Sequence, residues 1–236
     1  MGCEGAASLN KDHCHIVSTS PPEVHRAYLK QYQQDFKLFL KSRSEELVPG
    51  GAMVLMHLGK DETPRRTSWE IVSLILNDML LEVNKIFFFN WLLISLWWHL
   101  TSYGFEICTV GFDWRTKLEW FNIPVYEPRV EEVKDVIEEE ESLFLQRLEV
   151  VIWPWEEGLN IEGGDDSFRN ENMRAEIITK HARAALEPLL SEKFDAKVIN
   201  EVFVRFQNKI VQIMKVGKLE SAIFIMSIRK NAWRSF

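Results

Sequence analysis

The residue types best suited to metal chemistry form the short segment His13-Cys14-His15. Imidazole and thiolate are ligands that zinc and other transition metals prefer. Adjacent residues of an extended chain point to opposite faces, so only His13 and His15 could share one metal. No further Cys or His spacing completes a site. We therefore interpret this segment as an ordinary loop, and we interpret His57 and His181 either as packed core histidines or as residues at a pocket edge.

The common motifs of nucleotide sites and hydrolytic sites are absent from the sequence. There is no GxGxxG turn, no P-loop, no GxSxG turn and no HExxH motif. A nucleotide-type cofactor normally lies against a Gly-rich turn between a strand and a helix. No cofactor site of that type can therefore be recognised by motif in these 236 residues.

Composition favours a globular protein with a substantial core, because 46% of the residues are hydrophobic and 27% are charged. The formal net charge of -7 argues against binding to nucleic acid, which needs clustered Lys and Arg. Three cysteines without a CxxC pair favour a reducing compartment. The first ten residues do not resemble a signal peptide, so we expect a cytoplasmic protein.

Residues 86–100, IFFFNWLLISLWWHL, contain no charged side chain. Four interpretations are open: a membrane span, a buried helix, a partner-binding surface, or a segment foreign to the rest of the chain. A span needs about 20 consecutive apolar residues. Trp91, Trp97 and Trp98 lie inside the run, whereas aromatic residues of a membrane helix gather at its ends. We therefore expect that the protein is not integral to a membrane.

Hydrophobic periodicity predicts an α/β protein in which helices outnumber strands. Residues 22–47 have apolar side chains at helical spacing after Pro21, and Pro49, Gly50 and Gly51 follow this helix. The short apolar run that comes next, AMVLMHLG at residues 52–59, predicts a buried strand. The other expected elements are helices at 69–82, 130–141, 170–190 and 196–214 and strands at 143–153 and 221–230.

Four blocks of the sequence resemble the SABATH family of plant S-adenosylmethionine-dependent carboxyl methyltransferases. They are TSPPEVHRAYLKQYQQDFKLFLKSRSEELVPGGAMVLMHLG, FNIPVYEPRVEEV, RAALEPLLSEKF and FIMSIRK, in family order. The resemblance covers about residues 9–83 and 117–230. It implies methylation of the carboxyl group of a small plant acid such as salicylate, jasmonate, a gibberellin or benzoate, while relatives methylate xanthine nitrogens.

The fold that this resemblance implies is α/β, the C-terminal part of a class I, Rossmann-like methyltransferase sheet with an α-helical cap. Family members carry a long N-terminal part, with the early strands and the cofactor loop, before the block that matches Asn10-Lys11. Residues 1–236 are therefore expected to form a single truncated domain that lacks the first half of the sheet. Its expected parts are a sheet and helix part at 9–59, a mainly helical cap at 60–128 and 154–195, and closing strands at 143–153 and 221–230.

Residues 83 to about 111 interrupt the resemblance between the blocks NDMLLE and KLEWFNIP. Family members cross this interval with a shorter segment. Val83 requires a codon that begins with GT, and Asn84 and Lys85 have A-rich codons, as expected when translation reads through a splice donor. We interpret residues 83–111 as a non-family insertion derived from translated intron.

The resemblance also implies a Mg²⁺ site near the cap. Its ligands would be Asn10, Glu119, the backbone carbonyl of Phe121, and Asn122. Oxygen ligands of this kind suit a hard cation. Glu119 stands where the family has Asp and is one methylene longer, which disfavours the strict octahedral geometry of Mg²⁺. The alternative is that Asn10 caps a turn and that Glu119 is an ordinary surface residue.

Substrate-binding residues are implied at four positions of the cap. Trp69 matches the Trp that packs on the substrate ring, and Ser68 precedes it at a position that varies with substrate. Ala182 and Ala185 match pocket-lining positions, where their small side chains would suit a bulky acid. The alternative for Trp69 is an ordinary core aromatic, because Trp is highly buried in general.

Two functions of different classes remain open. The first is a fragment of an S-adenosylmethionine-dependent carboxyl methyltransferase, inactive alone, whose carboxylate substrate is already a nucleophile and needs positioning rather than a general base. The second is a non-catalytic module that pairs with a full-length homologue, or a membrane-associated protein that uses residues 86–105. The expected partners are a small carboxylic acid and, since many family members are dimers, a second copy, with no nucleic acid and no membrane.

Overall fold

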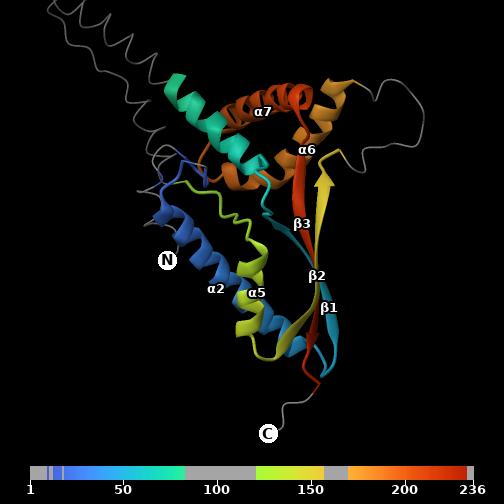
Figure 1. The fold of residues 1–236 in the computed structure, drawn as a ribbon. Coiled ribbons are helices and arrows are strands. Elements are labelled where there is room, and N and C mark those ends of the chain that lie inside the picture. Colours follow the sequence, from blue (N-terminus) through green and yellow to red (C-terminus); the bar gives the residue numbers. More distant parts are fainter. Residues whose placement is uncertain (1–9, 11–12, 18, 83–120, 157–169, 233–236) are drawn as a thin grey trace, which may run out of the picture.

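The computed structural model describes residues 10, 13–17, 19–82, 121–156 and 170–232. An antiparallel sheet with the strand order β1-β3-β2 forms the centre of this part of the chain (Figure 1). β1 spans Ala52–Gly59, β2 spans Leu143–Pro154 and β3 spans Glu220–Lys230. The predicted α/β class and the three predicted strands are therefore confirmed. The interpretation of residues 83–111 as an insertion lies outside the described residues.

Two helices, α2 (Pro22–Glu46) and α5 (Val130–Glu139), cover one face of the sheet (Figure 1). Pro22 lies in the first turn of α2, where its missing N–H removes no intrahelical hydrogen bond. The predicted apolar stripe of α2 buries Tyr32, Phe36 and Leu40 against the same cluster as Phe224 of β3. This contact fixes the sheet through residues that are far apart in sequence.

The opposite face of β1 is exposed, so the expectation of a buried strand is wrong for half of its side chains. Val54 and Met56 retain 69% and 68% of their accessible surface, whereas Met53 and Leu55 pack on the α2 side. Successive residues of a strand point to opposite faces, so a strand covered on one side alternates in exposure. No described helix lies on the outer side of this part of the sheet (Figure 1).

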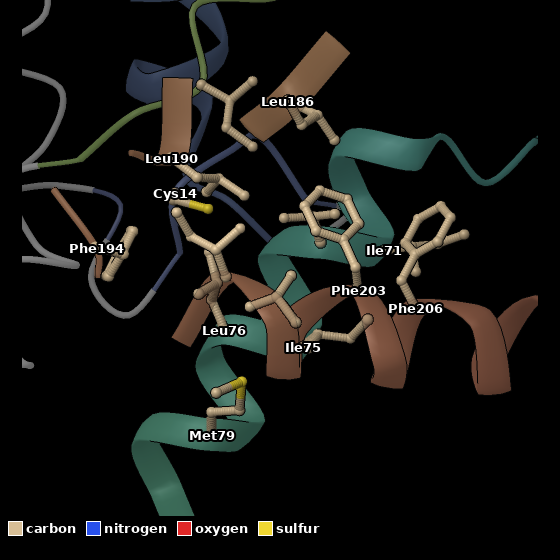
Figure 2. Close-up of a cluster of buried hydrophobic side chains, with 14 of the residues drawn as sticks. Cys14, Ile71, Ile75, Leu76, Met79, Leu186, Leu190, Phe194, Phe203 and Phe206 are labelled. Atoms are coloured by element: carbon tan, nitrogen blue, oxygen red, sulfur yellow. The ribbon is translucent and has the colours of Figure 1, made fainter. Parts of the chain in front are cut away.

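Three helices pack together beside one end of the sheet: residues 68–82, α6 (Glu171–Leu190) and α7 (Ala196–Val216). Side-chain oxygens of Asn170 and Asp195 accept backbone N–H bonds of the first turns of α6 and α7, which fixes where these helices begin. Figure 2 shows their apolar side chains pointing toward one another. Among them, Leu76 and Phe206 are fully buried.

Candidate functional site

The four predicted substrate-binding residues line one cavity of about 260 Å³. Ser68 and Trp69 come from the first turn of the helix at 68–82, and Ala182 and Ala185 come from α6. The cavity is completed by Leu58, Thr67, Glu127, Trp155, Ile178, His181 and Ser221. Two segments more than a hundred positions apart in sequence therefore converge on a mostly apolar space next to the end of β1.

Glu127 is the charged residue of this cavity that sequence reasoning missed. Its Oε1 accepts a hydrogen bond from Nε1 of Trp69 at 3.2 Å, which fixes the plane of the indole ring. Burial raises the pKa of the Glu127 carboxyl, and the nearby Glu70 adds to this, although Lys60 and the hydrogen bond from Trp69 act in the opposite direction. The available signal was its place in the block FNIPVYEPRVEEV, between two prolines.

The two histidines with ambiguous predictions differ in position. His181 lies on α6 and lines the cavity, so it is a residue of the pocket edge. His57 points to the other side of β1 and contacts the rings of Tyr32 and Phe36, with centroid distances of 5.5 and 6.0 Å. Burial lowers the pKa of His57, as expected for a packed core histidine.

A second, more polar cavity of about 470 Å³ adjoins the first. The two cavities share Thr67, Glu127 and Ser221. The second also contains His15 and Lys60, and Lys60 directly follows the last residue of β1. A larger cavity of about 560 Å³ lies between the helix at 68–82 and α7 and contains none of the predicted site residues.

Asn10, the first predicted metal ligand, holds its own loop together. It is buried, and its Nδ2 donates to the carbonyl oxygens of His15 at 2.9 Å and His13 at 3.3 Å. Its Oδ1 accepts from the hydroxyl of Ser20 at 2.7 Å. Three of the four hydrogen bonds available to a carboxamide are thus made within the protein. This geometry corresponds to the alternative role of a turn-capping residue.

The segment that carries Phe121 and Asn122 does lie beside the loop of Asn10. The backbone N–H of Ile123 donates to the carbonyl of Cys14 at 2.6 Å, so the two blocks are adjacent. However, Oδ1 of Asn122 accepts from the hydroxyl of Tyr28 at 3.3 Å, and Glu119 lies outside the described residues. Within the described part of the chain, no group of three His, Cys, Asp or Glu could hold a metal ion. The described donors therefore do not fit a ready-made Mg²⁺ site.

Cys14 and His15, which sequence analysis placed in an ordinary loop, are buried by this same contact. The backbone N–H of Cys14 donates to Oγ of Ser73 at 3.1 Å. Burial raises the pKa of the Cys14 thiol to about 12, which keeps the thiol protonated and unreactive at neutral pH. The ring of His15 packs edge-on against Tyr28 at 5.9 Å.

Comparison with known proteins agrees with this arrangement. The family described as SAM dependent carboxyl methyltransferase matches residues 2–87 and 93–231. The chain belongs to this family. The methyltransferase resemblance inferred from the four blocks is thereby confirmed. The family as described depends on S-adenosylmethionine.

Curated members of the methyltransferase family include Caffeine synthase 1 of Camellia crassicolumna, which is 30% identical over 231 residues. Probable 7-methylxanthine methyltransferase PCS2 of Camellia ptilophylla is 31% identical over the same length. Each alignment covers 95% of this chain and 53% of the relative, so the chain spans about half the length of the curated relatives it matches.

A solved structure, loganic acid methyltransferase with SAH, has a similar fold. Its TM-score is 0.64 at 20% sequence identity, and the match covers 95% of this chain and 55% of that one. The partial methyltransferase fold is thus confirmed by structure as well as by sequence. Among the described residues, no helix is long and apolar enough to cross a membrane. The run at 86–100 lies outside them.

Proposed function

We propose that this chain forms the acceptor-binding part of an S-adenosylmethionine-dependent methyltransferase that methylates the carboxyl group of a small plant acid. The observation that carries the proposal is the convergence of Ser68, Trp69, Ala182 and Ala185 on one 260 Å³ cavity. The family resemblance implies these four residues from two segments that are more than a hundred positions apart in the sequence. A volume near 300 Å³ is the lower range for pockets that bury a small organic ligand.

The residues of the cavity would act by positioning. The indole of Trp69, held by Glu127, offers a flat apolar wall, and the two alanines leave room for the body of the acid. S-adenosylmethionine, when bound, supplies the methyl group. A carboxylate is already a nucleophile, so the wall needs to orient it and exclude water rather than remove a proton.

Glu127 favours a second candidate acceptor, a heterocyclic N–H. A carboxylate in the cavity wall repels an acid placed beside it, whereas its oxygen can accept a hydrogen bond from a ring N–H. Four of the curated relatives that the chain matches are named as xanthine methyltransferases. The two candidates differ in the sign of their response to Glu127→Gln, which should improve binding of an acid and weaken binding of a xanthine.

The test is a single-chain chimera in which the N-terminal part of a relative is joined at residue 9 and residues 83–110 are deleted. We expect this chimera to bind S-adenosylmethionine and to methylate one of the two acceptor classes. The 236-residue chain contains no GxGxxG turn, so we expect no thermal shift when the chain alone is mixed with the cofactor. A site filled at 100 times its dissociation constant would stabilise the fold by about 2.7 kcal/mol, which is readily detected. A chimera that binds the cofactor but neither acceptor would contradict the proposal.

Trp69→Ala in this chimera should damage acceptor turnover far more than cofactor affinity. We expect kcat/KM for the acceptor to fall by about ten- to a hundredfold, at about 1.4 kcal/mol per factor of ten, with little change in cofactor Kd. Phe39→Ala is the matched control, because Phe39 is an exposed aromatic residue on α2 and does not line the cavity. Equal losses in both variants would indicate a general effect on folding.

The Mg²⁺ site implied by the family resemblance remains a proposal. Its ligands would be Asn10, Glu119, Phe121 and Asn122. We expect weak Mg²⁺ binding at best, and we expect Glu119→Asp to tighten it by restoring the shorter carboxylate. Isothermal calorimetry of the two proteins with Mg²⁺ measures the difference. Glu131→Asp on α5 provides the same change of chain length at a position not implied as a ligand. Identical isotherms for the chain and Glu119→Asp would assign these residues a structural role.

A further inference from the structure

The loop between β1 and the helix at 68–82 ends in the sequence Arg65-Arg66-Thr67-Ser68-Trp69. Two adjacent arginines occur nowhere else in the 236 residues. Protein kinases select their substrates in large part by the pattern of charge around the modified residue. One broad class of Ser/Thr kinases prefers basic residues two and three positions before the modified serine and a large apolar residue directly after it. Ser68 meets all of these conditions, so the segment has the form of a kinase recognition sequence.

The structure gives the two hydroxyl groups of this segment different positions. Oγ1 of Thr67 accepts the backbone N–H of Glu70 at 3.2 Å, so Thr67 is the N-cap of the helix. Ser68 is the first residue of that helix and is half-buried, and it lines the 260 Å³ cavity, which we call the acceptor cavity. The hydroxyl of Thr67 is thus used by the fold. Ser68 stands at the spacing that the two arginines specify.

The recognition sequence lies mostly in irregular chain at the protein surface. Residues 64–67 belong to no helix or strand, and Arg66 is exposed. Arg65 is less free, because its guanidinium pairs with Asp61 and its Nε lies 3.9 Å from a carboxylate oxygen of Glu220. A kinase must therefore draw Arg65 away from Asp61 and open the first turn of the helix. Local openings of this kind, at helix ends and in surface loops, cost far less free energy than global unfolding.

We propose that Ser68 is a modification site for a Ser/Thr kinase that recognises basic residues, and that its phosphorylation closes the acceptor cavity to acids. The kinase transfers the γ-phosphoryl group of ATP to Oγ of Ser68. A new P–O bond forms, the bond between the γ-phosphorus and the bridging oxygen breaks, ADP leaves, and the hydroxyl proton passes to a base of the kinase. The modification itself is independent of the proposed function, whereas its effect on acids rests on that function.

The effect on acids follows from charge. Phosphorylation adds about −1.5 to −2 charge to a serine at pH 7. The cavity that receives this charge already contains the carboxyl group of Glu127. The first turn of a helix tolerates a phosphate well, because the helix dipole favours negative charge there, so the helix at 68–82 should persist. An acid acceptor would then meet a like charge in its cavity, whereas an uncharged acceptor would lose only the space that the phosphate occupies.

The test uses the folded 236-residue chain, ATP and the catalytic subunit of cAMP-dependent protein kinase, with a synthetic peptide of residues 61–72 as the reference substrate. We expect modification of the chain at Ser68, located by tandem mass spectrometry, and none at this position in Ser68→Ala. Arg66→Ala should slow the modification by about tenfold or more, because it removes a charge-assisted contact with the kinase. Asp61→Asn should speed it by about two- to fivefold, because it frees Arg65 from its ion pair. The Asn oxygen can still accept the backbone N–H of Thr63.

Ser44 and Ser191 are the matched control serines. Ser44 has Lys41 three positions before it but is buried, and Ser191 is exposed but follows the uncharged residues 188–190. Both should stay unmodified. Modification of the peptide but not of the folded chain would show that the fold hides Ser68 and would overturn the proposal. Absence of modification in both would overturn it as well, because the sequence would then not be recognised at all.

The effect on acids is measured in the single-chain chimera after treatment with the kinase, with and without ATP. We expect phosphorylation to lower kcat/KM for an acid acceptor by about tenfold or more, and we expect no ATP-dependent loss in the Ser68→Ala chimera. An unchanged kcat/KM in a chimera fully phosphorylated at Ser68 would overturn the closure of the cavity. Phosphorylation of Ser68 in a chimera that methylates no acceptor would support the modification site and contradict the proposed function, so the two failures are distinguishable.

Discussion

Gly59→Ala is expected to destabilise the protein by about 2–3 kcal/mol, although it adds a single methyl group. A Cβ atom at Gly59 would lie 2.3 Å from two ring carbons of Phe224 on the neighbouring strand. Phe224 has no accessible surface and packs in the cluster between the sheet and α2, so its ring has no free space into which to move. Urea unfolding followed by far-UV circular dichroism measures the change in the free energy of unfolding.

A double-mutant cycle shows whether the effect arises from this contact. Phe224→Ala alone should cost about 3–5 kcal/mol, because it leaves a large cavity in the core. In that background Gly59→Ala should cost less than about 1 kcal/mol, because the atoms it would clash with are gone. Gly217→Ala is the control glycine, since a Cβ there would meet nothing within 4 Å. The same cost for Gly59→Ala in both backgrounds would show that the ring contact is not the cause.

The elements of the fold could be predicted from sequence because their signals are local. The stripe of α2 and the turn at Pro49 and Gly50 determine where that helix ends and β1 begins, and Gly50 has the positive φ of 75° that such a turn favours. The α/β class followed from the order of the predicted helices and strands along the chain. A local pattern does not state which faces have a covering layer, and so the exposure of Val54 and Met56 was not predicted.

The candidate site could be predicted only in part, for a similar reason. Trp69 and Ala185 were identified by their matches to the family, and the fold brings them together. Glu127 was missed because its importance depends on a contact with Trp69, 58 positions away, that no spacing rule describes. Asn10 shows the same limit, because the resemblance implies a metal ligand there, whereas the hydrogen bonds of its side chain to the His15 carbonyl and the Ser20 hydroxyl were not predictable from residue type.

His15 should make the protein lose stability as the pH falls below neutrality. Burial lowers the pKa of this imidazole to about 4 from 6.5, although a hydrogen bond with the Ile123 backbone opposes the shift and the charge of Lys60 adds to it. Between these two values the unfolded chain binds a proton that the folded chain excludes, so stability rises with pH. The contribution is fully present above the unfolded pKa of 6.5 and is lost as the pH falls toward 4. Between pH 7 and pH 5 the loss from His15 alone is about 2 kcal/mol.

The measurement is the free energy of unfolding in urea at half-unit steps from pH 7.5 to pH 5, a range given by the two pKa values above, for the chain and for His15→Gln. The variant cannot take up this proton, so its stability should fall less steeply over the range, whatever its stability at pH 7. Burial also lowers the pKa of His25 and His57, so some pH dependence should remain in the variant. If His15→Gln gave the same slope as the chain, the imidazole of His15 would be protonated equally in the folded and unfolded states. The packing of His15 against Tyr28 would then not hold it neutral.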